Sequence, residues 1–385
     1  IISKKCIFSK KENYIFMRVA LISLVWSFGE IILSKTSYFW IGIGESLIPG
    51  DLYFAGLASL IGSAGVSFLV QMIGFWIFYI FVKWKNKKNI NKEFLSGITI
   101  IFLLHLIGGY LIHPSNRIAE YPIAIWQTNT PTREKLFLSN QKTTDKMIFQ
   151  QEKAISKGAK LLVAPEGTLN TNFVFQQPSK IDTLIGGFRK GKNNVRNSLL
   201  GFKKGEKFYS HYLDKYRLVP FGEKVPNIFS KFLLDFSSLG GIEPGNKKRF
   251  FKWENTPPFA AVICYEITDG LQIRDAIRNG SKFILSIANL DPYPSKLFDQ
   301  YLSLARMRSI ENNIDTVIVS NTGPSGLIRN DARFDKLLES RIENIEVVDI
   351  HLLKNSTFYN RFGLYPLIIS FIFILIYINF FEKVN

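Results

Sequence analysis

The sequence contains few of the residues that build metal sites and disulfide frameworks. Its 385 residues include two cysteines and four widely scattered histidines. Two cysteines exclude a disulfide scaffold and a cysteine-rich metal cluster, and scattered histidines argue against a histidine-built zinc site. Nothing in the sequence indicates a metal ion or an organic cofactor, so we expect neither.

Acidic residues are also scarce relative to basic ones. The chain has 31 Asp and Glu against 48 Lys and Arg, which gives a formal net charge of +17. Charged residues make up only 21% of the chain and hydrophobic residues 47%, with 34 phenylalanines. This composition is too apolar for a disordered chain or an ordinary soluble protein, and no nucleic-acid-binding motif accompanies the basic charge. We therefore expect a membrane, and no nucleic acid, as a partner.

Four segments are long and apolar enough to cross a bilayer, which takes about 20 residues. They cover residues 16–33, 65–82, 94–112 and 364–381. The alternative, buried core helices, is less favoured because soluble domains rarely place their most apolar runs at both ends of the chain. We predict a membrane region at 1–112, a catalytic domain at 113–362 and a C-terminal transmembrane helix at 363–385.

Basic residues near the predicted spans indicate their orientation. Several lysines lie between residues 83 and 92, and others precede the first span and follow the last. Because short loops rich in Lys and Arg stay in the cytoplasm, we predict that the domain at 113–362 is extracytoplasmic. The first span lacks a signal-peptide cleavage site, so we expect a retained anchor. Met17 opens the first apolar run, so either residues 1–16 are an over-extended start or the chain is a fragment.

Short β-rich apolar runs alternate with helix-like stretches in the middle region. Strands are predicted at residues 123–126, 161–164, 259–263, 283–287 and 316–320. Helices are predicted at 134–157, 269–279 and 299–312, and hairpin strands at 186–208. Strands that alternate with helices indicate one α/β domain, and such folds usually place their chemistry where a strand ends.

Three segments of this region carry chemically reactive side chains. Glu166 follows Pro165, which is predicted to end the strand pairing, Lys215 lies in a second segment, and Cys264 ends an apolar strand. A thiol attacks an acyl carbon as thiolate, and it needs a base or a positive neighbour to form one. No histidine lies in these segments, which argues against a Cys–His pair, but a carboxylate and a lysine can do the same work. Taken singly, each residue has a simpler interpretation: Cys264 as a buried small side chain, Glu166 as a solvated turn residue and Lys215 as a surface cation.

The order Glu166, Lys215, Cys264 and the triplet Cys264-Tyr265-Glu266 resemble the nitrilase, or carbon–nitrogen hydrolase, superfamily, whose catalytic triad is Glu, Lys and Cys. The resemblance covers about residues 120–350. It implies an α/β fold, a nitrilase-like αββα sandwich, here flanked by transmembrane helices.

Flanking segments narrow the resemblance to the apolipoprotein N-acyltransferase family of the bacterial inner membrane. The matching segments are 218–226 (LVPFGEKVP), 263–267 (ICYEI), 305–311 (ARMRSIE), 320–325 (SNTGPS) and 357–363 (TFYNRFG). Residues 62–69 also resemble the membrane segment that precedes the catalytic domain in that family. The resemblance thus covers most of the chain, including both membrane flanks.

The resemblance implies a role for each candidate residue. Glu166 is the general base, Lys215 stabilises the thiolate and the oxyanion, and Cys264 is the nucleophile. Glu223 and Glu266 match further active-site carboxylates, which position the lysine and the incoming amine; the alternative for both is a structural ion pair.

Two more residues complete the set. The backbone N–H of Tyr265 is a candidate oxyanion donor. Asn289 is the clear match in the segment 288–294 (ANLDPYP), where the family usually has Ser-Asn-Asp-x-Trp-Phe and where the loop helps to shape the acyl site. A second departure is that the family has about eight spans, whereas four are predicted here.

The resemblance also implies the reaction. A phospholipid, with phosphatidylethanolamine as the expected donor, passes a fatty acyl chain to Cys264 as a thioester, and the α-amine of a diacylglyceryl-cysteine lipoprotein accepts it. Apolar residues in 228–239 form either the lip of a pocket open to the membrane or a core helix. We expect a monomeric multi-pass protein of the bacterial inner membrane with a periplasmic catalytic domain.

Two other functions are compatible with the sequence. The first is a membrane-tethered amidase of the same superfamily, which hydrolyses a small C–N bond; the segment 220–223 and the last span argue against it. The second is a catalytically inactive membrane scaffold. The absent helices and the altered segment 289–294 favour a scaffold, whereas intact Glu166, Lys215 and Cys264 oppose it.

Overall fold

A computed structural model of the chain describes residues 15–113, 117–135, 139–171, 173–192, 194–220, 222–223, 241–253, 255–353 and 356–383. The chain forms two compact units. The first combines Ile1–His113 with Ser356–Asn385, and the second is Pro114–Asn355. We call them the membrane unit and the α/β unit.

The membrane unit is built from helices. They are α2 (Ile15–Ser34), α3 (Ile43–Ser46), α4 (Leu52–Ala55), α5 (Ala58–Lys85), α6 (Asn91–Leu111), α12 (Phe358–Phe362) and α13 (Tyr365–Lys383). Within the described part of the chain, α2, α5 and α6 are long and apolar enough to cross a membrane, which confirms three of the four predicted spans. The fourth segment forms α13, whose apolar stretch Tyr365–Asn379 is shorter.

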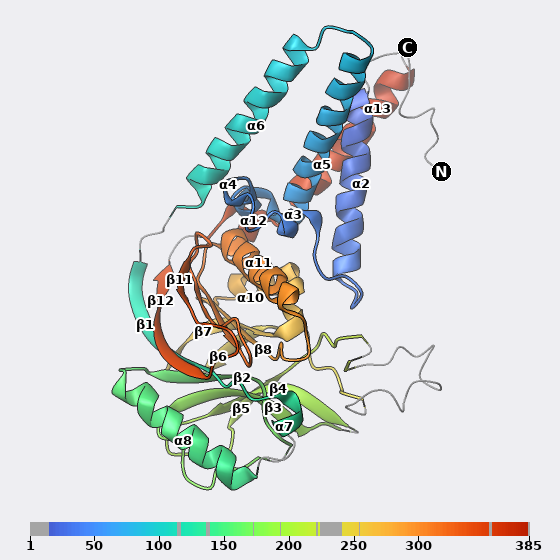
Figure 1. Ribbon diagram of the computed structural model, residues 1–385. Helices are drawn as coiled ribbons and strands as arrows, with labels where there is room; N and C mark the ends of the chain where they lie inside the picture. The colour runs from blue at the N-terminus through green and yellow to red at the C-terminus, as the bar shows by residue number, and fades with distance from the viewer. Residues whose placement is uncertain are drawn as a thin grey trace. The chain divides into compact units, whose positions relative to one another are not determined.

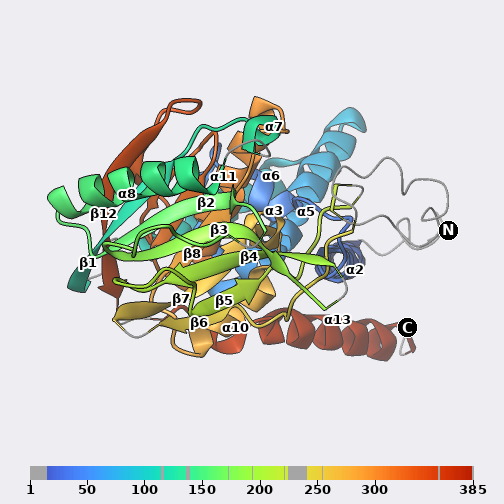
Figure 2. The same cartoon turned by 90° about the horizontal axis from the view of Figure 1, so that it is seen from below.

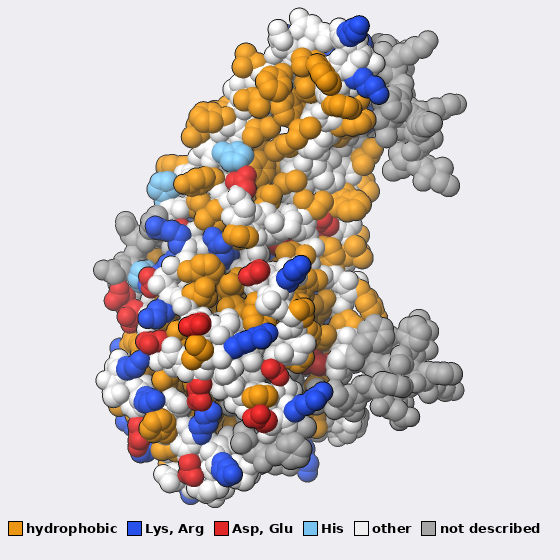
Figure 3. Space-filling model, viewed as in Figure 1, with side chains coloured by type: hydrophobic (Ala, Val, Ile, Leu, Met, Phe, Trp, Pro, Cys, Tyr) orange, Lys and Arg blue, Asp and Glu red, His pale blue; other side chains and the backbone are white. Residues whose placement is uncertain are grey.

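The exposed surface of the membrane unit is apolar. Figure 3 shows hydrophobic side chains gathered over its helices, and Trp84, Leu95, Tyr110 and Ile369 each expose more than half of their surface. Large apolar faces of this kind are stable against lipid rather than against water. The chain is therefore a membrane protein.

Helices α2, α5 and α13 lie side by side (Figure 1). The buried carboxylate of Glu30 in α2 accepts a hydrogen bond from Ser67 Oγ of α5 at 2.6 Å and from the backbone N–H of Ile43 at 3.2 Å. Helix α5 is interrupted at Gly62, where φ is +69° and a Cβ would lie 2.4 Å from the ring of Tyr359. Glycine alone fits this close approach.

The α/β unit contains two mixed six-stranded sheets, of which the first has the order β12-β1-β2-β3-β4-β5. Its strands are β1 (Arg117–Gln127), β2 (Leu161–Leu169), β3 (Asp182–Lys190), β4 (Val195–Phe202), β5 (His211–Asp214) and β12 (Asn344–Leu353). Strands β1, β2 and β3 run parallel, and the others pair antiparallel. The antiparallel β3–β4 pair confirms the predicted hairpin.

The second sheet has the order β11-β10-β9-β8-β7-β6. Its strands are β6 (Phe250–Trp253), β7 (Thr256–Ile263), β8 (Ile284–Ala288), β9 (Thr316–Ser320), β10 (Gly326–Ile328) and β11 (Phe334–Leu337). Strands β7, β8 and β9 are parallel. All five predicted strands are present, and all of them belong to the parallel centres of the two sheets.

The two sheets pack face to face, with helices on their outer faces. Helix α8 (Asn140–Ser156) covers the first sheet (Figure 2), and α10 (Gly270–Arg278) and α11 (Ser295–Asn312) pack on the second. In β1, Ala124 and Trp126 pack with Met147 of α8, whereas the buried Ile123 and Ile125 alternate to the opposite face. Parallel strands buried on both faces are continuous apolar runs in the sequence. The arrangement confirms the predicted αββα sandwich.

Two predicted helices differ in their boundaries. The stretch 134–157 is divided into α7 (Thr132–Lys135) and α8, because Ser139 caps α8 by accepting a hydrogen bond from the backbone N–H of Lys142 at 3.3 Å. Helix α11 begins at Ser295, before the predicted start at 299, with Pro294 at its N-cap.

Candidate active site

Glu166 lies where strand β2 loses its regular pairing. Strand β2 pairs with β3 as far as Ala164, and the register shifts before Leu169. Gly167 has a φ of +66°, a conformation that favours glycine, so the chain turns directly after Glu166. The break agrees with the one predicted at Pro165, but the Glu166 side chain is buried, not solvated.

Lys215 follows strand β5 and is 1% exposed. Its backbone N–H donates to the carbonyl of Asn197 at 2.8 Å, and its carbonyl accepts from the N–H of Gly245 at 2.8 Å. Its Nζ lies 2.8 Å from Oε1 of Glu166 and 2.9 Å from the carboxylate of Glu223. Although burial opposes the charge, these two carboxylates raise the pKa of Lys215 well above its ordinary value. The buried lysine is therefore a permanent cation between two carboxylates.

Cys264 lies at a sharp turn between β7 and the short 3-10 helix η2 (Cys264–Thr268). Its φ is +52°, which a non-glycine residue adopts at an energetic cost. Burial raises the pKa of the Cys264 thiol well above its ordinary value; the charge of Glu166 and a hydrogen bond to it add to this effect, and Lys215 opposes it. The resting thiol is therefore neutral.

The carboxylate of Glu166 is held in its ionised form. Burial alone would raise its pKa, but the Lys215 ammonium and two further hydrogen bonds lower the pKa below its ordinary value. The donors are the backbone N–H of Asn289, 2.8 Å from Oε2, and Nδ2 of Asn197, 2.6 Å from Oε1. A neutral thiol beside an ionised carboxylate is the arrangement that general-base activation needs.

Asn197 is a site residue that the sequence analysis missed. Its Nδ2 donates to Glu166 and also, at 3.0 Å, to Oε1 of Glu223, while the backbone N–H of Val219 donates to Oε2 of Glu223 at 3.0 Å. Asn197 thus holds the two carboxylates on either side of Lys215. It lies inside strand β4 and belongs to no motif, so only the pairing of the strands reveals it.

Glu266 lies in a separate ion pair and does not bind Lys215. Its carboxylate accepts from Nη1 of Arg249 at 2.9 and 3.0 Å, from the backbone N–H of Ile263 at 2.9 Å and from that of Tyr216 at 2.7 Å. Both ends of the pair are about 1% exposed. This arrangement matches the alternative considered for Glu266, a structural ion pair. Through the N–H groups of Ile263 and Tyr216, the Glu266 carboxylate also connects the Cys264 turn to the residue that follows Lys215.

The segment after β8 reaches the same cluster. Besides the backbone contact to Glu166, Asn289 accepts from Nδ2 of Asn321 through Oδ1 at 3.0 Å. Tyr293 lies in the part of this segment that departs from the family pattern, and burial raises its pKa to about 12. Tyr293 is therefore a neutral phenol, and no motif in the sequence had marked it.

Tyr265 follows Cys264, and its side chain is buried with the Arg217 guanidinium 5.1 Å from the ring centroid. Across the residues that are described, no group of three or more His, Cys, Asp or Glu could hold a metal ion. The predicted lip at 228–239 lies outside the described residues.

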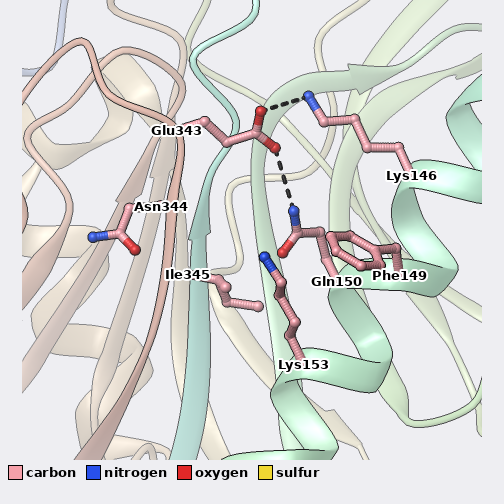
Figure 4. Close-up of a pocket in the computed structure, with 7 residues that line it drawn as sticks. All are labelled: Lys146, Phe149, Gln150, Lys153, Glu343, Asn344 and Ile345. Atoms are coloured by element: carbon pink, nitrogen blue, oxygen red, sulfur yellow. Dashed lines mark hydrogen bonds and ion pairs between the residues drawn. The ribbon is translucent and has the colours of Figure 1, made fainter.

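A pocket of about 460 Å³ lies between α8 and β12 (Figure 4). Lys146 binds Glu343 there at 3.0 Å, Nε2 of Gln150 donates to the same carboxylate at 3.3 Å, and Phe149 and Lys153 lie on the neighbouring turns of α8. None of the predicted site residues lines this pocket. It is thus separate from the cluster around Cys264.

Comparison with known sequences identifies the family. The chain is 50% identical to an apolipoprotein N-acyltransferase of Prochlorococcus marinus subsp. pastoris over 375 residues, which cover 97% of this chain and 75% of that protein. The chain belongs to the apolipoprotein N-acyltransferase family. It is also 38% identical to the apolipoprotein N-acyltransferase of another Prochlorococcus marinus strain, over 96% of this chain and 74% of that protein. The predicted family and enzyme class, an N-acyltransferase, are confirmed.

Solved structures of nitrilase-superfamily proteins are more distant. A carbon–nitrogen hydrolase from Helicobacter pylori is 14% identical over 60% of this chain and 89% of its own, with a TM-score of 0.47. An amidase of the nitrilase superfamily from Nesterenkonia is 16% identical over 61% of this chain and 92% of its own, with a TM-score of 0.45. No family model matches the chain.

Proposed function

We propose that the protein transfers a fatty acyl chain from a membrane phospholipid, through a thioester on Cys264, to the N-terminal amine of a diacylglyceryl-cysteine lipoprotein. The observation that carries the proposal is the buried cluster of Glu166, Lys215 and Cys264 in a chain of the apolipoprotein N-acyltransferase family. Phosphatidylethanolamine is the expected donor, and the protein acts as a monomer.

The first half-reaction forms the thioester. Glu166 takes the thiol proton of Cys264 as the sulfur attacks the ester carbonyl of the phospholipid. The carbon–oxygen bond then breaks, and protonated Glu166 returns the proton to the departing oxygen, which leaves as a lysophospholipid. The ionised Glu166 and the neutral thiol support these roles.

The negative charge that develops on the carbonyl oxygen needs donors that are already in place. Lys215 is the cation of the site, and two carboxylates at 2.8 and 2.9 Å keep it charged and fixed. The backbone N–H of Tyr265, which directly follows the nucleophile on the sharp turn, is the second donor. Glu223 and Asn197 position Lys215 and Glu166.

The second half-reaction transfers the acyl chain. The neutral α-amine of the lipoprotein attacks the thioester carbon, Glu166 takes the excess proton of the amine, and the carbon–sulfur bond breaks as the amide forms. The thiolate of Cys264 recovers a proton from Glu166, which restores the resting cluster. The same base thus serves both half-reactions.

The position in the cell follows from the substrates and from the charges. Both substrates stay in a bilayer, which suits a multi-pass protein of the bacterial inner membrane with a membrane region at 1–112 and a C-terminal helix at 363–385. The lysine-rich segment 83–92 supports a periplasmic position for the catalytic domain at 113–362. That domain carries 36 basic and 25 acidic residues, which favours contact with anionic headgroups.

Complementation tests the function. In a strain depleted of its own N-acyltransferase, the protein should restore growth, and mass spectrometry of a lipoprotein N-terminus should show a third acyl chain. The Cys264→Ser variant, inserted in the membrane at the same level, is the matched control. Lipoproteins that remain diacylated in the presence of the inserted wild-type protein would contradict the proposal.

A further inference from the structure

Lys135 lies at the end of α7, where the charge of Glu166 acts on its ammonium. Helix α7 is attached to the segment after β8, because the backbone N–H of Thr132 donates to Oδ2 of Asp291 at 2.8 Å and Nδ2 of Asn289 donates to Thr132 Oγ1 at 3.0 Å. The backbone carbonyl of Lys135 itself accepts a hydrogen bond at 3.1 Å from the side chain of Asn170, which directly follows β2. The loop that carries Lys135 is therefore tied to two of the strand ends that form the site.

The ammonium of Lys135 is buried without a hydrogen bond. Only 7% of the residue is exposed, and its Nζ has no hydrogen-bond partner among the described residues. Burial lowers the pKa of Lys135 to about 8, although the charges of Glu166 and Asp291 oppose the change. A buried cation with three unused donors is unfavourable unless a ligand supplies the acceptors.

The contrast with Lys215 shows which of the two buried lysines can take a ligand. Two N–H groups of Lys215 are occupied by Glu166 and Glu223, at 2.8 and 2.9 Å. The site thus holds one lysine that is committed to protein carboxylates and one, Lys135, whose donors are unused. The sequence analysis did not identify Lys135 as a site residue, because it lies in a one-turn helix and belongs to no motif or predicted strand.

The neighbours of Lys135 indicate where its ligand lies. The charges that act on Lys135 are those of Glu166 and Asp291, whereas those that act on Cys264 are Glu166, Lys215 and Glu223. Thr132, three residues before Lys135, binds Asp291 and Asn289, and the backbone N–H of the same Asn289 binds the Glu166 carboxylate. Lys135 therefore belongs to the loop on the Asn289–Asp291 side of Glu166. A ligand of Lys135 on this side of Glu166 is a part of the substrate other than the carbonyl that Cys264 attacks.

We propose that Lys135 binds the phosphate of the phospholipid acyl donor while the thioester forms. The inference rests on the proposed function, in which a glycerophospholipid places its phosphate a few bonds from the ester. An ammonium and a phosphate form charge-assisted hydrogen bonds, which are stronger than neutral ones. The phosphate leaves with the lysophospholipid, and the diacylglyceryl acceptor has none. Lys135 therefore selects the donor in the first half-reaction and has no ligand in the second.

Lys135→Met tests this role, because methionine fills the same buried space without a charge. With the full-length protein in phospholipid–detergent micelles, kcat/KM for thioester formation on Cys264, followed by intact mass, should fall at least about tenfold through KM. Lys135→Arg should keep the rate within about threefold, since it restores the cation. Lys142→Met, which removes an exposed lysine of the neighbouring helix α8, should match the wild type.

Two substrates without phosphate separate this role from a structural one. Acylation of Cys264 by a p-nitrophenyl fatty ester, and transfer from preformed acyl-enzyme to a diacylglyceryl peptide, should be unchanged in Lys135→Met. An equal loss with the p-nitrophenyl ester would mean that Lys135 acts through Glu166, and an unchanged rate with phospholipid would mean that it binds no phosphate; either result overturns the inference. A wild-type protein that reacts with the p-nitrophenyl ester but never with phospholipid would instead refute the proposed function.

Discussion

Two buried groups of charged side chains flank the Cys264 turn, and they differ in composition. The first group has two carboxylates, Glu166 and Glu223, for one ammonium, Lys215. The second has one carboxylate, Glu266, for one guanidinium, Arg249, and is complete by itself. The first group therefore carries an excess negative charge and can accept a proton, whereas the second is neutral.

The comparison assigns a different role to each group at this strand end: the first acts on the Cys264 thiol, and the second holds the backbone of the turn in place. The charge of Glu166 helps to raise the pKa of the Cys264 thiol, so the excess charge of the first group acts on that thiol. The carboxylate of Glu266 binds the backbone N–H groups of Ile263 and Tyr216, so it fixes the distance between the turn and the Lys215 segment. Removing a charge from each group should therefore affect different quantities.

The largest effect is expected for Glu166→Gln. Glutamine keeps the size of the side chain but cannot accept the thiol proton, so the rate of thioester formation should fall by about three orders of magnitude or more. The melting temperature should change little. Acyl-enzyme formation at the wild-type rate, measured by intact mass, would remove Glu166 from the role of base.

Glu223→Gln should have an intermediate effect on the rate. It leaves Lys215 with one carboxylate and retains a hydrogen-bond acceptor, so kcat should fall about 10- to 100-fold, as for other groups that position a catalytic residue. The KM for phospholipid should stay unchanged. A fall as large as that for Glu166→Gln would show that Glu223 itself exchanges a proton with the substrate.

Glu266→Gln should act on stability more than on chemistry. It leaves Arg249 buried without its charged partner, which costs about 3–5 kcal/mol when a buried pair is broken. The midpoint of thermal unfolding in detergent should drop, and the rate per folded molecule should stay within about tenfold of the wild type. Unchanged stability with lost activity would place Glu266 in the reaction itself.

Tyr293→Phe should have the smallest effect. Burial raises the pKa of this phenol to about 12, so Tyr293 stays protonated and uncharged at any working pH. Removing its hydroxyl should leave the pH profile of thioester formation unchanged and alter the rate by less than about threefold. If the rate of thioester formation in Tyr293→Phe no longer rose or fell with pH between pH 6 and 9 as it does in the wild type, the phenol would have to titrate during the reaction.

Much of the fold was predictable because its parallel strands are buried on both faces and are continuous apolar runs. Glu166 and Cys264 could be found for the same reason, since each follows such a run, whereas Lys215 follows the short antiparallel edge strand β5 and was found through the family motif. Glu266 shows the limit: the family resemblance implied that it helps to position the lysine and the incoming amine, with an ion pair as the alternative, and only the fold shows that its partner is Arg249. Asn197 and Lys135 were missed because long-range pairing, not local pattern, brings them to Glu166.

The identity of the nucleophile is the central claim, and the mass of the protein after exposure to phospholipid alone tests it most directly. The wild type should gain the mass of one acyl chain, which neutral hydroxylamine releases as it does from thioesters. Cys264→Ser should gain none, because a hydroxyl is far harder to ionise than a thiol, whose pKa is about 8.5. A Cys264→Ser protein that still acquires an acyl chain, or that acylates a lipoprotein amine at near wild-type rate, would contradict the thioester mechanism.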